Sequence, residues 1–264
     1  MKIYDCFSYW DEDLLLDLRL NILNNHVDYF VITEGDKTWQ NNPKKLRFDI
    51  KKFANFEKKI IYIPVTDMPA GDNPYLRENH QRNCLERGFA KADKNDIIII
   101  SDLDEIPNPK VLNKFKSDLR FAVFKQKHFY YKLNLLNINS PDWHGSRICI
   151  KKYLKSPQWL RNIKIKERNF LLKYIYRENY QIIKDGGWHF SDIKTPRELI
   201  QKISSFAHGE LNQDKFKNEE IINKKIENLK DVFDRPIKYE KVIIDKDFPD
   251  YFVENKHIYQ NWII

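Results

Sequence analysis

The sequence predicts an α/β fold with a mostly parallel central sheet and an elaborated C-terminal half. Two observations carry this prediction. Segments typical of buried strands alternate with amphipathic helical segments through the first hundred residues. Residues 96–101 also contain four consecutive isoleucines, which suits a central strand buried on both faces. With 264 residues, of which 42% are hydrophobic, the chain is long enough to bury a sizeable core.

The first half is expected to alternate strands and helices. An apolar run over residues 2–7 predicts the first strand, and Asp11 is expected to cap the helix that follows. Asn73 and Pro74 are typical of an N-cap and a first helical residue, so a second helix is expected to reach about residue 92. The apolar residues of the first helix recur at helical spacing: Leu14, Leu15, Leu18 and Ile22. The other strands expected in this half cover residues 27–33, 59–64 and 96–101.

The pattern changes after Pro107. Neighbouring strands are expected over 121–127 and 129–135, and short strands on either side of Gly186-Gly187, where glycine permits a close backbone approach or a positive φ. No repeat or linker interrupts the chain, so we expect one domain over 1–264, with a nucleotide-binding half at 1–107 and an elaborated half at 108–264. The remaining elements expected in this half are strands over 145–150, 181–184 and 188–190 and helices over 195–206 and 218–229.

Composition excludes several classes of protein. No apolar run approaches the roughly 18–20 residues of a membrane span. The three cysteines are far apart without a CxxC pair, which disfavours disulfide frameworks and Cys-based zinc sites. Acidic residues at 11–13 leave no room for a signal-peptide core, so a protein of a reducing compartment is expected. The net charge of +8 fits a solvated surface or attraction to an anionic partner, and no nucleic-acid-binding motif accompanies it.

An acidic motif follows the isoleucine run. Asp102, Asp104 and Glu105 come directly after that strand and directly before Ile106-Pro107. Ligand sites of open α/β sheets lie outside the carboxyl ends of the strands, and residues two apart on an extended backbone point the same way. Carboxylates placed in this way suit Mg²⁺ or Mn²⁺ bridging to a diphosphate. The alternative is that the acids only cap the next helix.

A second motif, Gly187-Trp188-His189-Phe190-Ser191, places a histidine between two aromatic residues. His189 suits either metal ligation through a neutral imidazole nitrogen or an ordinary hydrogen-bonded place in the core.

Together with other segments, these motifs resemble glycosyltransferase family 17. The resemblance runs over nearly the whole chain, and its order and spacing make it specific. The segments are Tyr4-Asp5-Cys6-Phe7, Glu12 with Leu14-Leu15 and Arg19-Leu20, Val27-Asp28-Tyr29-Phe30-Val31, Glu34, Glu78-Asn79-His80-Gln81-Arg82-Asn83, Ser101-Asp102-Leu103-Asp104-Glu105-Ile106-Pro107, Trp143 with Gly145 and Arg147, the His189 motif, Lys202-Ile203-Ser204-Ser205-Phe206-Ala207-His208, and Phe248-Pro249-Asp250-Tyr251-Phe252.

The resemblance implies a GT-A-like glycosyltransferase fold: a Rossmann-like nucleotide-sugar domain at 1–107, an acceptor side at 108–264 and a DxD motif. It further implies inverting transfer from a UDP-sugar, in the first place UDP-GlcNAc, to a hydroxyl of a glycan or lipid-linked glycan acceptor. With Mn²⁺ or Mg²⁺ as cofactor, Asp104 is the expected direct ligand and His189 a further ligand. Asp102 is expected to contact the ribose, or the metal through water.

Other positions are expected to bind substrates. Glu34 ends a strand and suits a hydrogen bond to a ribose or base edge, unless it is an exposed loop carboxylate. Arg77, Arg82 and Asn83 lie on the helix over 73–92 as donor-binding candidates. Arg82 suits either a diphosphate clamp or an i, i+4 salt bridge with Glu78.

Aromatic and basic residues of the second half are expected on the substrate side. Trp143 is expected to stack on a sugar face, Arg147 to contact phosphate or acceptor, and Trp188 to contact substrate. Ordinary packing is the alternative for these side chains.

Inverting transfer also needs a general base that takes the proton of the acceptor hydroxyl. Three carboxylates are open for this role: Glu105, Asp142 and Asp192, with Glu105 preferred. Glu105 would otherwise cap the helix near Pro107.

Two other classes of function compete. One is a metal-dependent phosphoesterase or nucleotide-sugar hydrolase that uses Asp102, Asp104 and His189. The other is a non-catalytic sugar- or anion-binding module. Because the chain starts almost at its first strand, a cytoplasmic enzyme without an anchor is expected. Its basic patches would make peripheral contact with the inner face of a membrane.

Overall fold

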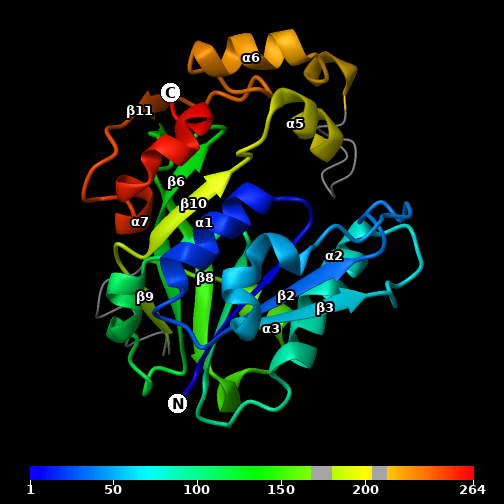
Figure 1. Ribbon diagram of the computed structural model, residues 1–264, viewed down its shortest axis with the longest axis vertical. Coiled ribbons are helices and arrows are strands. Elements are labelled where there is room, and N and C mark those ends of the chain that lie inside the picture. Colours follow the sequence, from blue (N-terminus) through cyan, green and yellow to red (C-terminus); the bar gives the residue numbers. More distant parts are fainter. Residues whose placement is uncertain (168–179, 204–212) are drawn as a thin grey trace.

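The structure is a computed structural model that describes residues 1–167, 180–203 and 213–264. In these residues an eleven-stranded mixed sheet carries helices on both faces (Figure 1). The main strand order is β11-β7-β6-β8-β4-β1-β2-β3, while β10 pairs with β5 and β6, and β9 pairs with β6. Residues 204–206, the end of the helix expected over 195–206, lie outside the described residues. Most of the segment 202–208 lies outside them too.

The first half confirms the parallel arrangement. Strands β1, β2, β3 and β4 all run parallel, with β1 hydrogen-bonded between β2 and β4. The four strands lie within a residue or two of the expected positions. Their bounds are β1 Ile3–Ser8, β2 Tyr29–Gly35, β3 Ile60–Val65 and β4 Ile97–Asp102.

Alternating side chains of these strands bury both faces of the sheet. In β4, Ile98 and Ile100 pack with Cys6 and Leu85 on one face, whereas Ile97 and Ile99 pack with Ala122 and Phe124 on the other. On β1 and β2, the face opposite Cys6 is covered by α1 (Asp13–Leu23), which lies across the sheet in Figure 1. The prediction that the isoleucine strand is buried on both faces is confirmed.

Of the two N-caps predicted in the first half, one is confirmed and the other is wrong. Asn73 caps α2 (Pro74–Asn83) by accepting a hydrogen bond from the Tyr75 amide, as expected. The helical segment then continues as the 3₁₀ helix η2 (Cys84–Phe89), so the expected end near residue 92 is nearly reached in two pieces. The prediction that Asp11 caps α1 is wrong: Glu12 holds the N-cap position, and the Asp11 carboxylate pairs with Lys194 and Arg47 instead.

The second half is mixed rather than mostly parallel. Strand β8 (Asp142–Ile150) runs antiparallel to both β4 and β6. The strand expected over 121–127 is confirmed within β6 (Phe121–Tyr130), which is irregular between Val123 and Lys125. The strand expected over 129–135 is wrong, because residues 131–134 form a bend and a turn. The chain leaves β6 at Tyr131, whose φ of 60° ends the extended backbone, and only the short β7 (Leu135–Asn137) follows. The local sequence shows a run of residues that favour strands, but it does not show at which residue the strand ends.

The Gly186-Gly187 turn has the backbone geometry that the sequence predicts. Gly187 has a φ of 130°, and a Cβ at this position would lie 2.1 Å from the carbonyl oxygen of Ile106. This close approach lets β10 (Gly187–Ser191) pair antiparallel with β5 (Glu105–Pro107). The pairing brings the His189 motif alongside the acidic motif.

The remaining helices surround this sheet, and α5 and α6 lie together at the top of Figure 1 over their own hydrophobic cluster. No helix in the described ranges is long and apolar enough to cross a membrane. The remaining elements are η1 Ile50–Lys59, η3 Pro109–Lys114, η4 Lys151–Tyr153, α3 Pro157–Arg161, β9 Tyr180–Ile183, α5 Pro196–Ile203, η6 Asp214–Phe216, α6 Glu219–Glu227, β11 Tyr239–Lys241, α7 Asp250–Glu254 and η7 Lys256–Trp262.

Candidate active site

A cavity of about 580 Å³ opens where β1 and β4 end. Ser8 and Asp102, the last residues of these adjacent parallel strands, both line it. This is the edge of an open α/β sheet at which ligands bind. The other lining residues are Tyr9, Trp10, Glu12, Trp39, Glu78, Gln81, Arg82, Leu103, Asp104, Tyr130, Trp143, His189, Ser191, Asp192, Lys202, Phe233 and Arg235.

Residues 102–105, termed the acid loop, are held from behind by α1. The fully buried Arg19 donates to both carboxylate oxygens of Asp5, at 2.6 and 2.7 Å. The same guanidinium donates to the carbonyl oxygens of Asp102, Leu103 and Glu105. These carbonyl oxygens are buried or half-buried, so they need a hydrogen-bond donor from the protein. Arg19 supplies it and thereby fixes the backbone of the acid loop.

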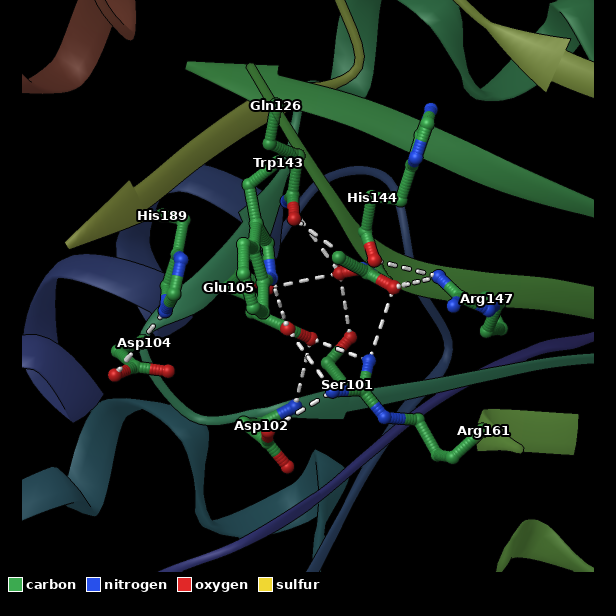
Figure 2. Close-up of polar contacts among 12 residues, drawn as sticks. Ser101, Asp102, Asp104, Glu105, Gln126, Trp143, His144, Arg147, Arg161 and His189 are labelled. Atoms are coloured by element: carbon green, nitrogen blue, oxygen red, sulfur yellow. Dashed lines mark hydrogen bonds and ion pairs between the residues drawn. The ribbon is translucent and has the colours of Figure 1, made fainter. Parts of the chain in front are cut away.

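Glu105 faces away from the cavity and is fully buried (Figure 2). Arg161, at the end of α3, donates to both of its carboxylate oxygens at 2.6 and 2.9 Å. Trp143 Nε1 donates to Oε1 at 2.8 Å, and the amide of Asp102 donates to Oε2 at 3.1 Å. Burial acts to raise the pKa of Glu105, but the charge of Arg161 outweighs it and the pKa is lowered. All the hydrogen-bonding groups around Glu105 therefore hold it as a fixed anion.

Asp102 lines the cavity between two arginines. Arg82 lies 3.0 Å from one of its carboxylate oxygens, and Arg161 lies 2.9 Å from the other. Burial acts to raise the pKa of Asp102, but these guanidinium groups outweigh it and hold the pKa well below its usual range. Arg82 also pairs with Glu78 at 2.9 Å. Both interpretations of Arg82 are therefore compatible with its place: it makes the i, i+4 salt bridge and it lines the cavity.

Asp104 points the other way, into the cavity and toward His189 (Figure 2). One carboxylate oxygen lies 3.6 Å from Nε2 of His189, which also lies 3.1 Å from the hydroxyl oxygen of Ser191. Burial acts to lower the pKa of His189, but the carboxylate of Asp104, followed by those of Glu105 and Asp102, outweighs it and raises the pKa. The structure thus brings together the two residues that the sequence proposes as direct metal ligands.

The His189 ring is fixed by stacking. It lies on the His128 ring with centroids 4.6 Å apart and planes 12° from parallel, and the Trp143 ring lies 4.9 Å away. Burial, with the nearby charges of His189 and Arg235, lowers the pKa of His128 to about 3, so His128 is neutral at physiological pH. A neutral imidazole can stack on His189 without adding a second positive charge.

The cavity lining also carries a charged pair just beyond the end of β10. Lys202 lies 2.8 Å from a carboxylate oxygen of Asp192, which directly follows β10 and has a φ of 56°. Burial acts to raise the pKa of Asp192, but Lys202 outweighs it and lowers the pKa, so the carboxylate is ionised at neutral pH. Of the three general-base candidates from the sequence, Asp192 lines the cavity, whereas Glu105 and Asp142 do not.

Several predicted donor-binding residues lie outside the cavity lining. Glu34 is fully buried and accepts hydrogen bonds from Lys44, the amides of Arg47 and Phe48, and the Tyr62 hydroxyl. It is therefore neither an exposed loop carboxylate nor a lining residue, and it organises the segment after β2.

Arg77 and Asn83 also bind the protein's own backbone. The Arg77 guanidinium donates to the carbonyl oxygens of Trp39, Pro69 and Gly71. The Asn83 side chain accepts a hydrogen bond from the amide of Gln158, at the start of α3. Asn83 thus positions the short helix that carries Arg161.

Of the second-half candidates Asp142, Trp143, Arg147 and Trp188, only Trp143 lines this cavity. Asp142 is exposed and pairs with Lys125 at 2.8 Å. Arg147 is buried and donates to the carbonyl oxygens of His144 and Gly145, and burial lowers its pKa to about 10. Trp188 precedes His189 on β10, so its side chain points to the opposite face of the strand. There its Nε1 donates to the carbonyl oxygen of Asp247.

Sequence reasoning missed Arg161, the cation that links Asp102 and Glu105. The signal that Ser156-Pro157 starts a helix is present, because Ser156 caps α3. Nothing local, however, shows that α3 ends against the acid loop. His128 and Lys202 were also missed as site residues, since their partners lie 61 and 10 positions away in the sequence.

The family resemblance implies a divalent metal, and the groups around Asp104 fit one. Nδ1 of His189 is buried without a hydrogen-bond partner among the described residues, while Nε2 faces the Asp104 carboxylate. An oxygen and a nitrogen ligand at a cavity edge suit Mn²⁺ or Mg²⁺, which complete their shells with substrate phosphates and water. Among described residues, no third ligand atom of a His, Cys, Asp or Glu joins this pair within 4.8 Å.

Comparison with known proteins agrees with the resemblance. The enzymes named β-1,4-mannosyl-glycoprotein 4-β-N-acetylglucosaminyltransferase from Homo sapiens, Rattus norvegicus and Mus musculus are each 23% identical over 227 residues. The match covers 74% of this chain and 41% of each relative, so the chain spans less than half the length of these curated relatives.

A solved structure, that of the glycosyltransferase GlyE from Streptococcus pneumoniae TIGR4, overlaps 69% of this chain and 45% of its own. Its identity is 11% and its TM-score 0.35, too low to support a shared fold. The family model described as Glycosyltransferase family 17 matches residues 1–245. Because that match covers well over half of the chain, the protein belongs to glycosyltransferase family 17.

Proposed function

We propose that this protein transfers a sugar from a nucleotide-sugar donor to a hydroxyl of a glycan acceptor. Within that class we propose UDP-GlcNAc as donor and inversion at the anomeric carbon. The family membership and the names of the relatives support this choice. We also assign the arrangement to the GT-A type, because parallel strands β1 and β4 end at a cavity that carries an acidic motif.

The observation that carries the proposal is the pairing of Asp104 with His189 at the cavity edge. Asp104 and His189 would hold the divalent cation, which when bound stabilises the negative charge of the departing nucleotide diphosphate. Arg82 lies beside Asp102 on the same cavity wall and would contact the donor phosphates directly. Asp102 then keeps Arg82 in place and accepts hydrogen bonds from the donor ribose.

The aromatic residues of the cavity suit planar and ring-shaped ligands. Trp10 and Trp39 lie with ring centroids 6.3 Å apart, and Trp143 forms a separate wall against His189. Their faces would bury the base and the sugar rings while leaving polar edges free for hydrogen bonds. These walls would also exclude water, which protects the donor from hydrolysis.

We assign the general base to Asp192. A base must lie within hydrogen-bond reach of the acceptor hydroxyl, so it must line the cavity and be ionised. Asp192 meets both conditions, because it lines the cavity and Lys202 favours its charged form. Glu105 instead acts as a positioning residue that holds Arg161, Trp143 and the Asp102 amide.

A screen of nucleotide sugars with Mn²⁺ tests the proposal, read out as release of nucleoside diphosphate with and without glycan acceptors. We expect turnover of one donor that rises when an acceptor is added. Asp104→Asn should reduce turnover by at least about 10²–10³-fold, because it removes a ligand charge beside the leaving group. The matched control is Asp142→Asn, which changes an exposed acid outside the cavity lining and should keep turnover within about twofold.

Three outcomes would contradict the proposal. Full turnover in Asp104→Asn would remove the metal assignment. Release of diphosphate that no acceptor increases would favour a nucleotide-sugar hydrolase. Nucleotide binding without turnover of any donor would favour a non-catalytic binding module.

A further inference from the structure

A second set of metal-ligand groups lies outside the cavity, where β3 meets α2. Asp67 follows β3, His80 lies in the last turn of α2, and Cys84 begins η2. Their ligand atoms all lie within 4.8 Å of one another. The geometry points to a Zn²⁺ site formed by the Asp67 carboxylate, the His80 imidazole and the Cys84 thiolate.

Helical spacing brings two of these ligands together. His80 and Cys84 are four residues apart, so they lie on one face of the helical segment. The Cys84 sulfur lies 3.5 Å from Nε2 of His80. The absence of a CxxC pair disfavours a zinc site built on cysteines alone, but a His and a Cys at helical spacing need no second cysteine.

The distances match the edges of a zinc tetrahedron. With Zn–S near 2.3 Å and Zn–N and Zn–O near 2.0–2.1 Å, tetrahedral geometry places S and N about 3.5 Å apart and N and O about 3.3 Å apart. The observed separations are 3.5 Å for Cys84 and His80 and 3.4 Å for His80 and Asp67. The 3.4 Å between His80 Nε2 and the Asp67 carboxylate is longer than a good N–H···O hydrogen bond. It suits two atoms that bind the same metal ion.

The donor set suits zinc rather than the metal proposed for the cavity. A thiolate and an imidazole are ligands that Zn²⁺ favours, whereas Mg²⁺ and Mn²⁺ prefer oxygen. The fourth zinc position would take a water, because the Asp67 side chain is 53% exposed and opens the site to solvent.

Neighbouring residues orient Asp67 and bury Cys84. Arg87 donates to both oxygens of Asp67, at 2.6 and 3.1 Å, which lowers the pKa of this carboxyl to about 2 and orients it. The Cys84 side chain is buried with Val65 and Met68, and burial raises the pKa of its thiol. The metal would therefore release a proton from Cys84 when it binds.

The site lies between the loop after β3 and α2. Asp67 belongs to the loop after β3, and Arg77 of α2 already donates to the carbonyl oxygens of Pro69 and Gly71 in that loop. Zinc would add a second link between the loop and α2, beside the arrowheads of β2 and β3 in Figure 1. Gln81 and Arg82, on the same helix, line the cavity.

Co²⁺ binding to the chelator-treated full chain tests the site, with Zn²⁺ as competitor. We expect one tetrahedral, thiolate-bound Co²⁺ per chain, seen as d–d bands and a thiolate-to-Co²⁺ charge-transfer band that are both lost when Zn²⁺ is added. Zn²⁺ should also raise Tm. Cys84→Ala should abolish the charge-transfer band, whereas Cys149→Ala, which removes another buried thiol, should retain it.

His80→Gln provides a second variant at a half-exposed position, where folding is not at risk. It should weaken Zn²⁺ binding by more than about tenfold, whereas His257→Gln at an exposed position should not. Asp104→Asn should leave the charge-transfer band unchanged, which separates this site from the cavity metal. Absence of a thiolate band in the wild type, or its persistence in Cys84→Ala, would show an ordinary hydrogen-bonded cluster and overturn the inference.

Discussion

Asp104 and Glu105 are neighbours in the acid loop, yet their surroundings differ completely. The Asp104 side chain is 23% exposed, lines the cavity and lies near His189. Glu105 is buried on the other side of the loop, where Arg161, Trp143 and a backbone amide donate to its two oxygens. Of the two carboxylates, only Asp104 can contact a ligand in the cavity.

The difference separates the acid of the motif that can reach a ligand from the acid that holds the loop in place. A fully buried carboxylate such as Glu105, whose oxygens all accept hydrogen bonds from its own chain, is a weak base and a poor ligand, because a ligand could reach it only by breaking those bonds. The cavity side of the loop should therefore respond to substitution in activity. The buried side should respond in stability.

The largest effect on activity should come from Asp192, on the cavity side. Asp192→Asn removes the proton acceptor, so kcat should fall by about 10²–10⁴-fold, or about 3–5 kcal/mol in the activation barrier. The shift in Tm caused by UDP with Mn²⁺ should be unchanged, because donor binding does not need the base.

Asp234→Asn is the matched control for Asp192→Asn. Asp234 also has a positive φ, at 58°, and pairs with a lysine, Lys225, at 2.7 Å, but it does not line the cavity. Asparagine tolerates that backbone conformation, so neither variant strains the chain. Equal kcat values for the two variants would remove Asp192 as base.

On the buried side, Arg161→Met should lower the free energy of unfolding by about 3–5 kcal/mol, because it leaves Glu105 buried without its cation. Urea unfolding followed by fluorescence measures this change. Arg47→Met removes an arginine whose side chain is 53% exposed and paired with Asp11 at 3.3 Å. That surface pair should contribute less than about 1 kcal/mol. If Arg161→Met and Arg47→Met lowered the free energy of unfolding by similar amounts, Arg161 would not hold Glu105 as the structure indicates.

A smaller effect should appear as a dependence on pH. The pKa values of Asp102 and Glu105 are lowered in the folded protein, with Arg161 as the main favourable cause. Their stabilisation is therefore present above the unfolded values of about 4 and is lost as the pH falls through and below them. The stability gap between wild type and Arg161→Met should narrow from pH 7 to pH 3. A gap that stays constant would assign the loss to packing alone.

The strands and helices that the sequence predicted best are those with local sequence signals. Strand β4 follows from its isoleucines, and α2 from Asn73 and Pro74, because burial and capping act within a few residues. The mixed second half did not follow, since β8 reaches its place by antiparallel pairing with β4 and β6, which no local pattern specifies. The division of β6 from β7 depended on one residue, Tyr131, with an unusual φ.

The candidate site was predictable in part for the same reason. Asp102, Asp104 and His189 lie in short motifs at strand ends, and the structure brings them to one cavity. Arg161 was missed because its role depends on where α3 ends in space. Glu34 was assigned to the donor because its position at a strand end resembles that of Asp102, although its oxygens bind the following segment of the chain.

Arg19 makes the motif dependent on a distant part of the chain. Its guanidinium joins Asp5 of the first strand to three carbonyl groups of the acid loop, which lie about 85 residues after Arg19 itself. A fragment that lacks the first 23 residues would leave those carbonyls buried without a donor. The aspartates would remain in the sequence, but they would no longer be presented at fixed positions. The geometry of the acid loop therefore depends on the opening strand and helix of the chain.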